Sequence, residues 1–116
     1  MTKPTPTQNL MTMLNLTPAE PVGGDDAFTA VTLTRETPRT YGGQVLAQAI
    51  MAADNTVSDK VLHSIHAYFL HPGDITKELI FTSQQLNNGR SFATRRVQAL
   101  QDDIPIFSAI ASFQKP

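Results

Sequence analysis

The segment from Gln44 to Ala53 limits the fold of this chain more than any other, because it is apolar almost all the way round a helix. Gly42 and Gly43 precede it, and only Gln44 and Gln48 interrupt it, one turn apart on one face. The apolar residues are Val45, Leu46, Ala47, Ala49, Ile50, Met51, Ala52 and Ala53. A surface helix has an apolar stripe on one side only, so this helix must be wrapped by the rest of the chain.

The rest of the chain supplies β-strands that can do the wrapping. Alternating or β-branched segments predict five strands, at residues 28–34, 61–71, 77–86, 91–100 and 104–114. Turn residues separate the last four of these strands, and Asn88-Gly89 is a strong hairpin signal because both residues tolerate positive φ. Pro105 stands near the start of the last strand, where a proline is tolerated.

The first part of the chain is predicted to be peripheral. Residues 1–8 are rich in Pro and Thr and are expected to form a flexible arm. Asn9 can cap a short helix that runs to Leu16. Pro18, Pro21 and the glycines at 23 and 24 are expected to end this helix and to form a connector.

The order of these elements predicts an α+β domain over residues 9–116. An antiparallel five-stranded sheet that curls around one long apolar helix is the economical way to bury them all, and this is the hotdog arrangement. A ferredoxin-like fold needs a second helix late in the chain, and the sequence offers none. A small barrel such as the OB-fold stays open as an alternative, although its helix would not need to be apolar all round.

Composition excludes several classes of function. The chain has 116 residues, enough for one domain with a real core, and its net charge of -1 provides no basic field for nucleic acid or an anionic membrane. The longest uncharged apolar stretch, residues 41–53, is shorter than the roughly 20 residues that span a bilayer. There is no cysteine, which suits a reducing cytoplasm, and no secretory signal is recognised. No zinc-spaced ligand set or phosphate-binding loop occurs, so neither a metal nor a cofactor is expected.

Three histidines, His63, His66 and His71, are the first candidates for chemistry. On an extended strand His63 and His71 share one face and His66 lies on the other, so His63 and His66 cannot hold one metal. Each histidine has a simpler interpretation as a half-buried residue that makes a hydrogen bond, and from the residues alone this interpretation is favoured.

The glycine pair and the arginines are the second and third candidates. Gly42 and Gly43 at a helix start would expose backbone N–H groups that can hold a carbonyl oxygen as it becomes negative. The simpler interpretation is a tight turn where strand meets helix. Arg95 and Arg96 point to opposite faces of their strand, so at most one of them lines a given groove and could meet a phosphate. A salt-bridged or solvent-facing arginine is the alternative for at least one of them, and Arg90 is a further candidate.

Four strings of the sequence can be compared together with known families. The strings are Tyr41-Gly-Gly-Gln-Val-Leu-Ala-Gln-Ala-Ile50, Leu62-His-Ser-Ile-His-Ala-Tyr-Phe-Leu-His-Pro-Gly-Asp74, Asn88-Gly-Arg-Ser-Phe-Ala-Thr-Arg-Arg-Val97 and Pro105-Ile-Phe-Ser-Ala-Ile-Ala-Ser-Phe-Gln114. In order and over nearly the whole chain, they resemble the amino-terminal domain of the acyl-CoA thioesterase II (TesB-like) family. The opening segment Asn9-Leu-Met-Thr-Met-Leu-Asn-Leu16 is also similar to the first helix of that family.

The resemblance implies hydrolysis of fatty acyl-CoA to a free fatty acid and coenzyme A, without a cofactor. It implies two hotdog domains per enzyme, with the water-activating Asp, Thr and Gln in the second. By analogy between the halves, Gln114 stands at the place of that Gln, His63 at the place of that Thr, and Gln44 or Gly43 near the place of the Asp. The resemblance and the residues together give His63, Gln44 and Gln114 as candidate catalytic residues. Gly42, Gly43, Arg95 and Arg96 are candidate substrate-binding residues.

No carboxylate occupies the place of the catalytic Asp, so the activity of this chain by itself is in question. A glutamine cannot take a proton from water, whereas His63 could do so if it lies beside the helix terminus. Three functions therefore stay open: a thioesterase domain that works with a second hotdog, a module that binds acyl-CoA without turnover, and a structural half. Because one hotdog offers half of an acyl-binding groove, we expect a homodimer or pairing with a second hotdog domain through the strand at 61–71.

Overall fold

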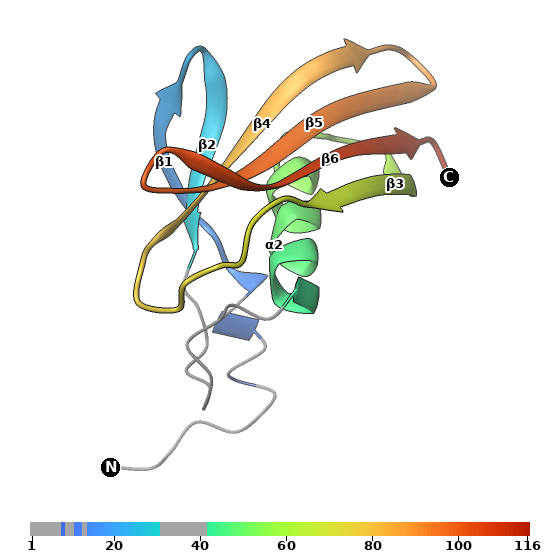
Figure 1. Cartoon of the computed structure of the whole chain (residues 1–116). Coiled ribbons are helices and arrows are strands. Elements are labelled where there is room, and N and C mark those ends of the chain that lie inside the picture. Colours follow the sequence, from blue (N-terminus) through green and yellow to red (C-terminus); the bar gives the residue numbers. More distant parts are fainter. Residues whose placement is uncertain (1–7, 9–10, 13, 31–41) are drawn as a thin grey trace.

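The computed structural model describes residues 8, 11–12, 14–30 and 42–116, and its strands form one antiparallel sheet. A single long helix, α2 (Gly42–Asp54), lies across one face of this sheet (Figure 1). The strand order across the sheet is β1 (Thr17–Val22), β2 (Asp25–Ala30), β4 (Leu79–Asn88), β5 (Phe92–Gln101), β6 (Ile104–Gln114) and β3 (Val61–Phe69).

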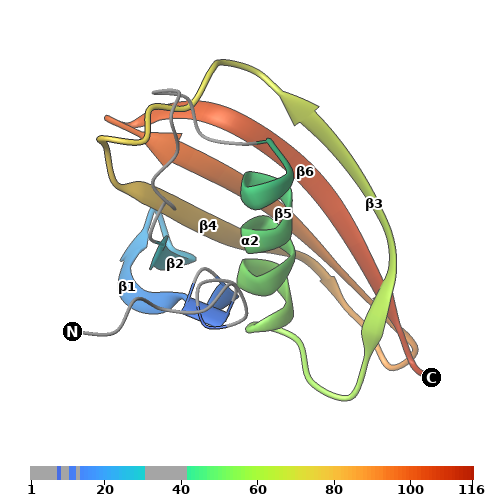
Figure 2. The ribbon, with the colours of Figure 1, turned by 90° about the horizontal axis from the view of Figure 1, so that it is seen from below.

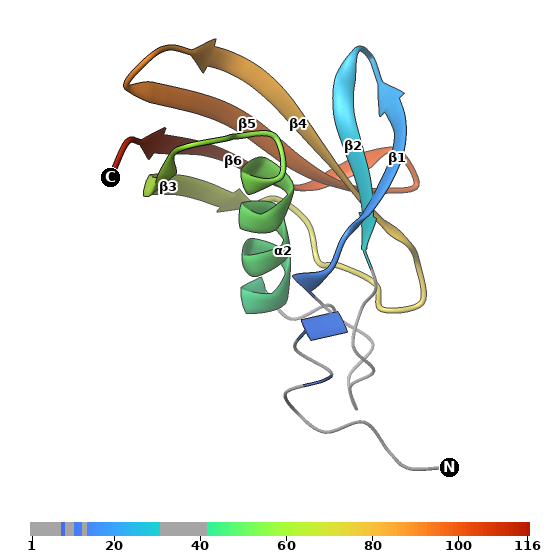
Figure 3. The same cartoon turned by 180° about the vertical axis from the view of Figure 1, so that it is seen from behind.

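The sheet is curved, and the helix occupies its concave side. Seen from below, α2 stands in front of β4, β5 and β6, while β3 arches round beside it (Figure 2). The view from behind places the β1–β2 hairpin on the far side of the helix from β3 (Figure 3). The predicted antiparallel sheet around one long helix is therefore confirmed.

Small residues on one side of α2 let it lie close to the sheet. Ala49, Ala52 and Ala53 have no exposed surface, and Val45 is 3% exposed. They belong to one core cluster with large side chains from the three central strands, among which are Phe81, Val97, Phe107 and Phe113. Alanine side chains bring the helix axis near the sheet, so the aromatic rings fill the space on either side of it.

The other side of α2 is only partly covered within this chain. Leu46, Ala47, Ile50 and Met51 are half-buried. By contrast, Gln44 and Gln48, the two interruptions of the apolar pattern, are among the buried residues of the helix, at 4% and 0% exposure. The wrapping predicted for this helix is thus incomplete, because one curved sheet can enclose only one side of a cylinder.

The prediction of five strands is wrong, because a sixth, β1, precedes them. Pro18 and Pro21 were expected to end a helix and to lie in a connector, but both belong to β1. This strand pairs with β2 alone, and a proline is tolerated in an edge strand where its missing N–H would face outward. Gly23 and Gly24 have φ of 58° and 86° and form the turn between Val22 and its partner Asp25. Two glycines with positive φ are typical of a tight hairpin, so the signal was present in the sequence.

The short amino-terminal helix predicted from Asn9 to Leu16 is not among the bounded elements of the structure. Residues 9–10 and 13 of that range, and 1–7 of the predicted arm, lie outside the described residues. Leu16 is 7% exposed and belongs to the core cluster, and β1 begins at the next residue. The strand predicted at 28–34 begins earlier, at Asp25, and residues 31–34 also lie outside the described part.

The four strands after the helix were located well from the sequence. Each lies within about two residues of its predicted bounds, and β3 ends at Phe69. Beyond it, the N–H groups of Leu70 and His71 both donate to the carbonyl oxygen of Ile106, at 2.8 and 3.2 Å. No helix in the described residues is long and apolar enough to cross a membrane.

Candidate functional site

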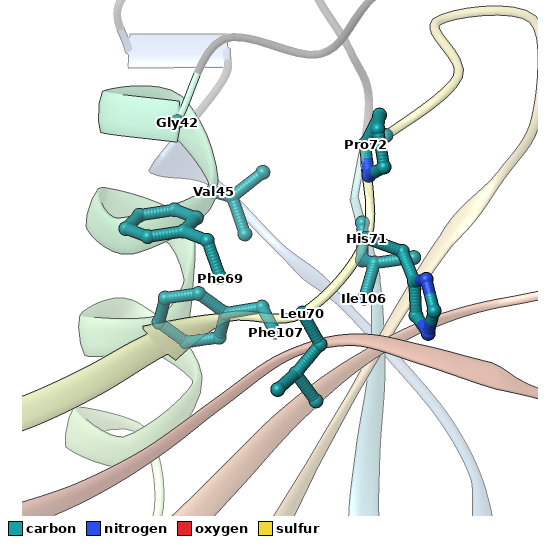
Figure 4. A pocket seen from close by; sticks show the side chains of 9 residues that line it. Gly42, Val45, Phe69, Leu70, His71, Pro72, Ile106 and Phe107 are labelled. Atoms are coloured by element: carbon teal, nitrogen blue, oxygen red, sulfur yellow. The ribbon is translucent and has the colours of Figure 1, made fainter.

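A pocket of about 340 Å³ opens at the amino-terminal end of α2 (Figure 4). Gly42 and Val45 line it from the helix, residues 69–73 from the end of β3 and the loop beyond, and Ile106 and Phe107 from β6. Its floor is apolar, and among the described residues that line it only His71 has an ionisable side chain. An apolar pocket with backbone donors at one side suits an acyl group attached to a carbonyl.

An aromatic ring lies close to the space that a side chain at Gly42 would occupy. A Cβ added to Gly42 would lie 3.3 Å from Cε1 of Phe69. The Phe69 ring meets the Phe107 ring edge to face, with centroids 5.2 Å apart and planes at 68°. The absence of a side chain thus brings the first N–H groups of the helix close to the apolar wall, where the helix dipole favours negative charge.

The Gly42-Gly43-Gln44 candidates therefore divide by environment. Gly42 lines the pocket, Gly43 is exposed, and the Gln44 side chain is buried against the core side of the helix. The interpretation that backbone N–H groups of the two glycines hold a carbonyl oxygen is compatible with this arrangement, because Gly43 is exposed.

His63 and Gln114 lie at the other end of the sheet from this pocket. His63 is exposed and sits at a register shift between Leu62 and Ser64, and Leu62 pairs with Phe113. Gln114 is half-buried and pairs with Val61 of β3. Gly42 contacts Phe69, at the other end of β3. Six residue steps of strand, or about 20 Å, therefore separate His63 and Gln114 from the start of the helix.

The expectation that His63 lies beside the helix start is therefore wrong within one chain. The chain runs down α2 and returns along β3, so the first residues of β3 lie near the end of the helix and its last residues near the start (Figure 2). The structure brings Gly42 together with Phe69 and His71, and it brings the His63 end of β3 together with Gln114.

Arg95, a candidate for substrate binding, is instead committed to the protein interior. It is 1% exposed, and all five of its N–H groups donate to neutral acceptors. Nε donates to Oγ1 of Thr56 at 2.8 Å, and Nη2 donates to the carbonyl oxygen of Thr56 at 3.0 Å. The remaining bonds reach the carbonyl oxygens of Asn87 and Thr94 and Oδ1 of Asn88.

This network joins the end of the helix to the β4–β5 hairpin. Oγ1 of Thr56 also donates to the carbonyl oxygen of Ala53 at 2.8 Å, in the last turn of α2. Burial lowers the pKa of Arg95 from its usual value, because desolvation penalises the charged form. No N–H group of Arg95 is left for a phosphate, which corrects its assignment as a ligand residue. Arg96 is exposed on the opposite face of β5.

Comparison with protein-family models places this geometry in a known family. Residues 29–114 match the model described as the acyl-CoA thioesterase N-terminal domain. The chain belongs to this family. The resemblance drawn from the sequence strings is thus confirmed.

Named relatives agree with the assignment to the thioesterase family. The chain is 37% identical over 105 residues to human acyl-coenzyme A thioesterase 8, covering 90% of this chain and 32% of that protein. It is 46% identical over 77 residues to acyl-CoA thioesterase 2 of Haemophilus influenzae, covering 66% of this chain and 27% of that protein. The chain therefore spans about a third of the length of the curated relatives it matches.

Solved structures agree with the fold. The tesB protein of Mycobacterium avium subs paratuberculosis superposes with a TM-score of 0.81 at 37% identity, over 91% of this chain and 42% of that one. A protein from Thermus thermophilus superposes with a TM-score of 0.76 at 18% identity, over 93% of this chain and 97% of that one. The second likeness concerns the fold alone.

Sequence reasoning missed two parts of the candidate site of this thioesterase domain. It treated residues 71–74 as a turn that closes a strand, whereas residues 70–73 form one wall of the pocket. It also did not single out Gln101, whose buried side chain forms hydrogen bonds with Asp74 in the loop between β3 and β4. The only signal was the position of the His71-Pro72-Gly73-Asp74 turn directly after a strand that ends in Phe69. In the described part of the chain, no group of three or more potential ligand side chains could hold a metal ion.

The Arg95 network yields a stability prediction. Arg95→Lys should lower the free energy of unfolding by about 3 kcal/mol or more, because a lysine cannot satisfy the buried acceptors that the guanidinium now reaches. Urea denaturation followed by circular dichroism measures the change. Arg96→Lys is the matched control and should change the free energy of unfolding by less than about 0.5 kcal/mol, since Arg96 is exposed. Equal effects of the two substitutions would contradict the structural role.

Proposed function

We propose that this chain is one half of an acyl-CoA thioesterase, which hydrolyses fatty acyl-CoA to a fatty acid and coenzyme A. The observation that carries the proposal is the apolar pocket at the start of α2, in a chain that belongs to the acyl-CoA thioesterase N-terminal domain family. The absence of cysteine suits the reducing cytoplasm, which we propose as its location.

The reaction needs an oxyanion site and a base. The oxygen of water attacks the thioester carbonyl, the carbonyl oxygen becomes negative, and backbone N–H groups at Gly42 and Gly43 stabilise that charge. The base takes a proton from the water and returns it to the sulfur as the C–S bond breaks. Among the candidates, His63 is the residue that can take this proton, because the amides of Gln44 and Gln114 cannot.

The edge strand β3 supports pairing with a second hotdog. β3 bonds to β6 on one side only, and its other edge has no partner strand among the described residues. Its large apolar side chains are exposed: Val61 by 51%, Leu62 by 37%, Tyr68 by 71% and Phe69 by 58%. An apolar, unpaired edge of this length is a site for strand addition or aggregation unless another strand covers it.

Antiparallel pairing through β3 would reunite the separated halves of the site. When two such strands pair about a two-fold axis, the start of one lies beside the end of the other. His63 and Gln114 of one domain would then lie toward the helix start and the pocket of its partner. The second hotdog is either another copy of this chain or a further domain, as the greater length of the relatives allows.

A second function, binding of acyl-CoA without turnover, is favoured by one observation. None of the described residues that line the pocket carries a carboxylate, and the place that corresponds, by analogy between the halves, to the catalytic Asp of the second hotdog lies near Gly43 or Gln44. A domain with the oxyanion donors but no strong base would hold the thioester and leave it intact.

A hydrolysis assay separates these functions. We expect little release of coenzyme A from a medium-chain acyl-CoA by this chain alone, and release when a second hotdog domain with the catalytic carboxylate is added. A thiol reagent that detects free coenzyme A measures the rate. Tight binding of the acyl-CoA without release in either case would favour the binding module over the enzyme.

The role of His63 can be tested in the active preparation. His63→Ala should lower kcat by about 10² or more, the usual contribution of a positioned base. His66→Ala is the matched control and should leave kcat unchanged, because His66 alternates with Ile65 and Ala67, which pack on the core. An unchanged kcat in His63→Ala would exclude His63 as the base.

Association through β3 predicts a dimer at micromolar concentration. Leu62→Lys should shift the protein toward monomer, because a charge on an edge strand opposes pairing. Sedimentation velocity measures the shift. Leu86→Lys serves as control, since Leu86 is 47% exposed near the end of the central strand β4. A wild-type monomer, or equal effects of the two substitutions, would contradict pairing through this edge.

A further inference from the structure

The loop between β3 and β4 forms one wall of the pocket. Four of its residues, 70–73, line the pocket. Leu70 and His71 are exposed, and Gly73, Asp74 and Ile75 are half-buried. Leu70, Pro72 and Ile75 are not among the residues of the hydrophobic core cluster, so hydrogen bonds at the two ends of this wall help to fix its shape.

The first end of this wall is fixed by backbone bonds. The N–H groups of Leu70 and His71 both donate to the carbonyl oxygen of Ile106 in β6. These bonds continue the pairing of β3 with β6 by one step. The second end lies at Asp74, which forms an isolated β-bridge outside the bounded strands.

Gln101 fixes the second end from the last position of β5. The residue is only 6% exposed, and its side-chain amide acts as a backbone peptide would. Oε1 accepts from the N–H of Asp74 at 2.9 Å, and Nε2 donates to the carbonyl oxygens of Asp74 at 2.8 Å and Lys77 at 3.3 Å. The loop and the strand that carries Gln101 are 24 to 27 residues apart in the sequence.

The other side-chain interactions of the described loop residues lie at the surface and are weaker. Lys77 forms an ion pair with Asp102, but both side chains are about half exposed or more, so solvent screens the pair. Oδ1 of Asp74 accepts from the N–H and the hydroxyl of Thr76, which orders the loop locally without attaching it to the sheet. Hydrogen bonds from Thr76 lower the pKa of Asp74, so this carboxylate stays charged at neutral pH.

We propose that Gln101 is a positioning residue for the acyl end of the substrate. It holds the wall at residues 70–73 against the pocket through Asp74, and so sets the space available to an acyl chain that enters beside Gly42. This inference rests on the proposed function, because it takes the pocket to be the acyl site. Gln101 itself does not line that pocket and acts through the loop.

Binding of two probes tests the proposal without requiring turnover. The probes are a medium-chain S-alkyl thioether of coenzyme A, which cannot be hydrolysed, and free coenzyme A. In the wild type the thioether should bind more tightly than coenzyme A. In Gln101→Met this advantage should fall about tenfold, equivalent to about 1.4 kcal/mol, while the affinity for free coenzyme A stays the same. Calorimetry measures both affinities.

Gln98→Met is the matched control, with the same chemical change on the same strand. Gln98 is half-buried on the opposite face of β5, where it pairs with Thr82 and Ser108. Gln98→Met should leave the affinities for both probes unchanged. Amide hydrogen exchange in Gln101→Met should accelerate at residues 70–77 and should stay unchanged in the strands and the helix.

The outcomes separate this inference from the proposed function. If the wild type binds the thioether no better than coenzyme A, the pocket is not an acyl site and both proposals fail. If the wild type shows the advantage and Gln101→Met retains it, only the positioning role is overturned. Should Gln101→Met not fold, Gln101→Asn, which draws the amide back by one methylene, must show the same selective loss. An equal loss for both probes would indicate a general structural role and overturn the proposal.

Discussion

The close packing of α2 on the concave face of the sheet is the contact on which the rest of this molecule depends. Ala49, Ala52 and Ala53 are fully buried and let the helix approach the central strands, whose aromatic rings fill the space beside it. This contact places the helix start against the end of β3, so that Gly42 and the Phe69 ring meet. The pocket exists because the two elements approach here without a side chain between them.

The same packing is sustained at the other end of the helix by a buried cation. Arg95 joins Thr56, just after α2, to the β4–β5 hairpin with hydrogen bonds to neutral acceptors only. An arginine suits this position because its planar fork can satisfy several carbonyl groups at once. The two ends of the helix thus differ in role, since the start borders a pocket and the end is attached to the sheet.

The separation of the candidate polar residues bears on the proposed pairing with a second hotdog domain. Within the described chain, His63 and Gln114 lie about 20 Å along the sheet from the helix start. The uncovered edge of β3 and the half-buried side of α2 both expose apolar surface that a single sheet cannot enclose. Both features are consistent with the proposed pairing with a second hotdog domain, in a chain that spans about a third of its curated relatives.

The sequence by itself determined the helix at 44–53, the four strands that follow it and the family, because apolar periodicity and turn residues are local signals. It failed at β1, where Pro18 and Pro21 resemble breakers until their place at a sheet edge is known. Only the tertiary structure decided that Arg95 is internal, that Gln101 holds the β3–β4 loop, and that His63 lies far from Gly42. Those facts depend on strand register and chain direction, which bring together residues that no local pattern relates.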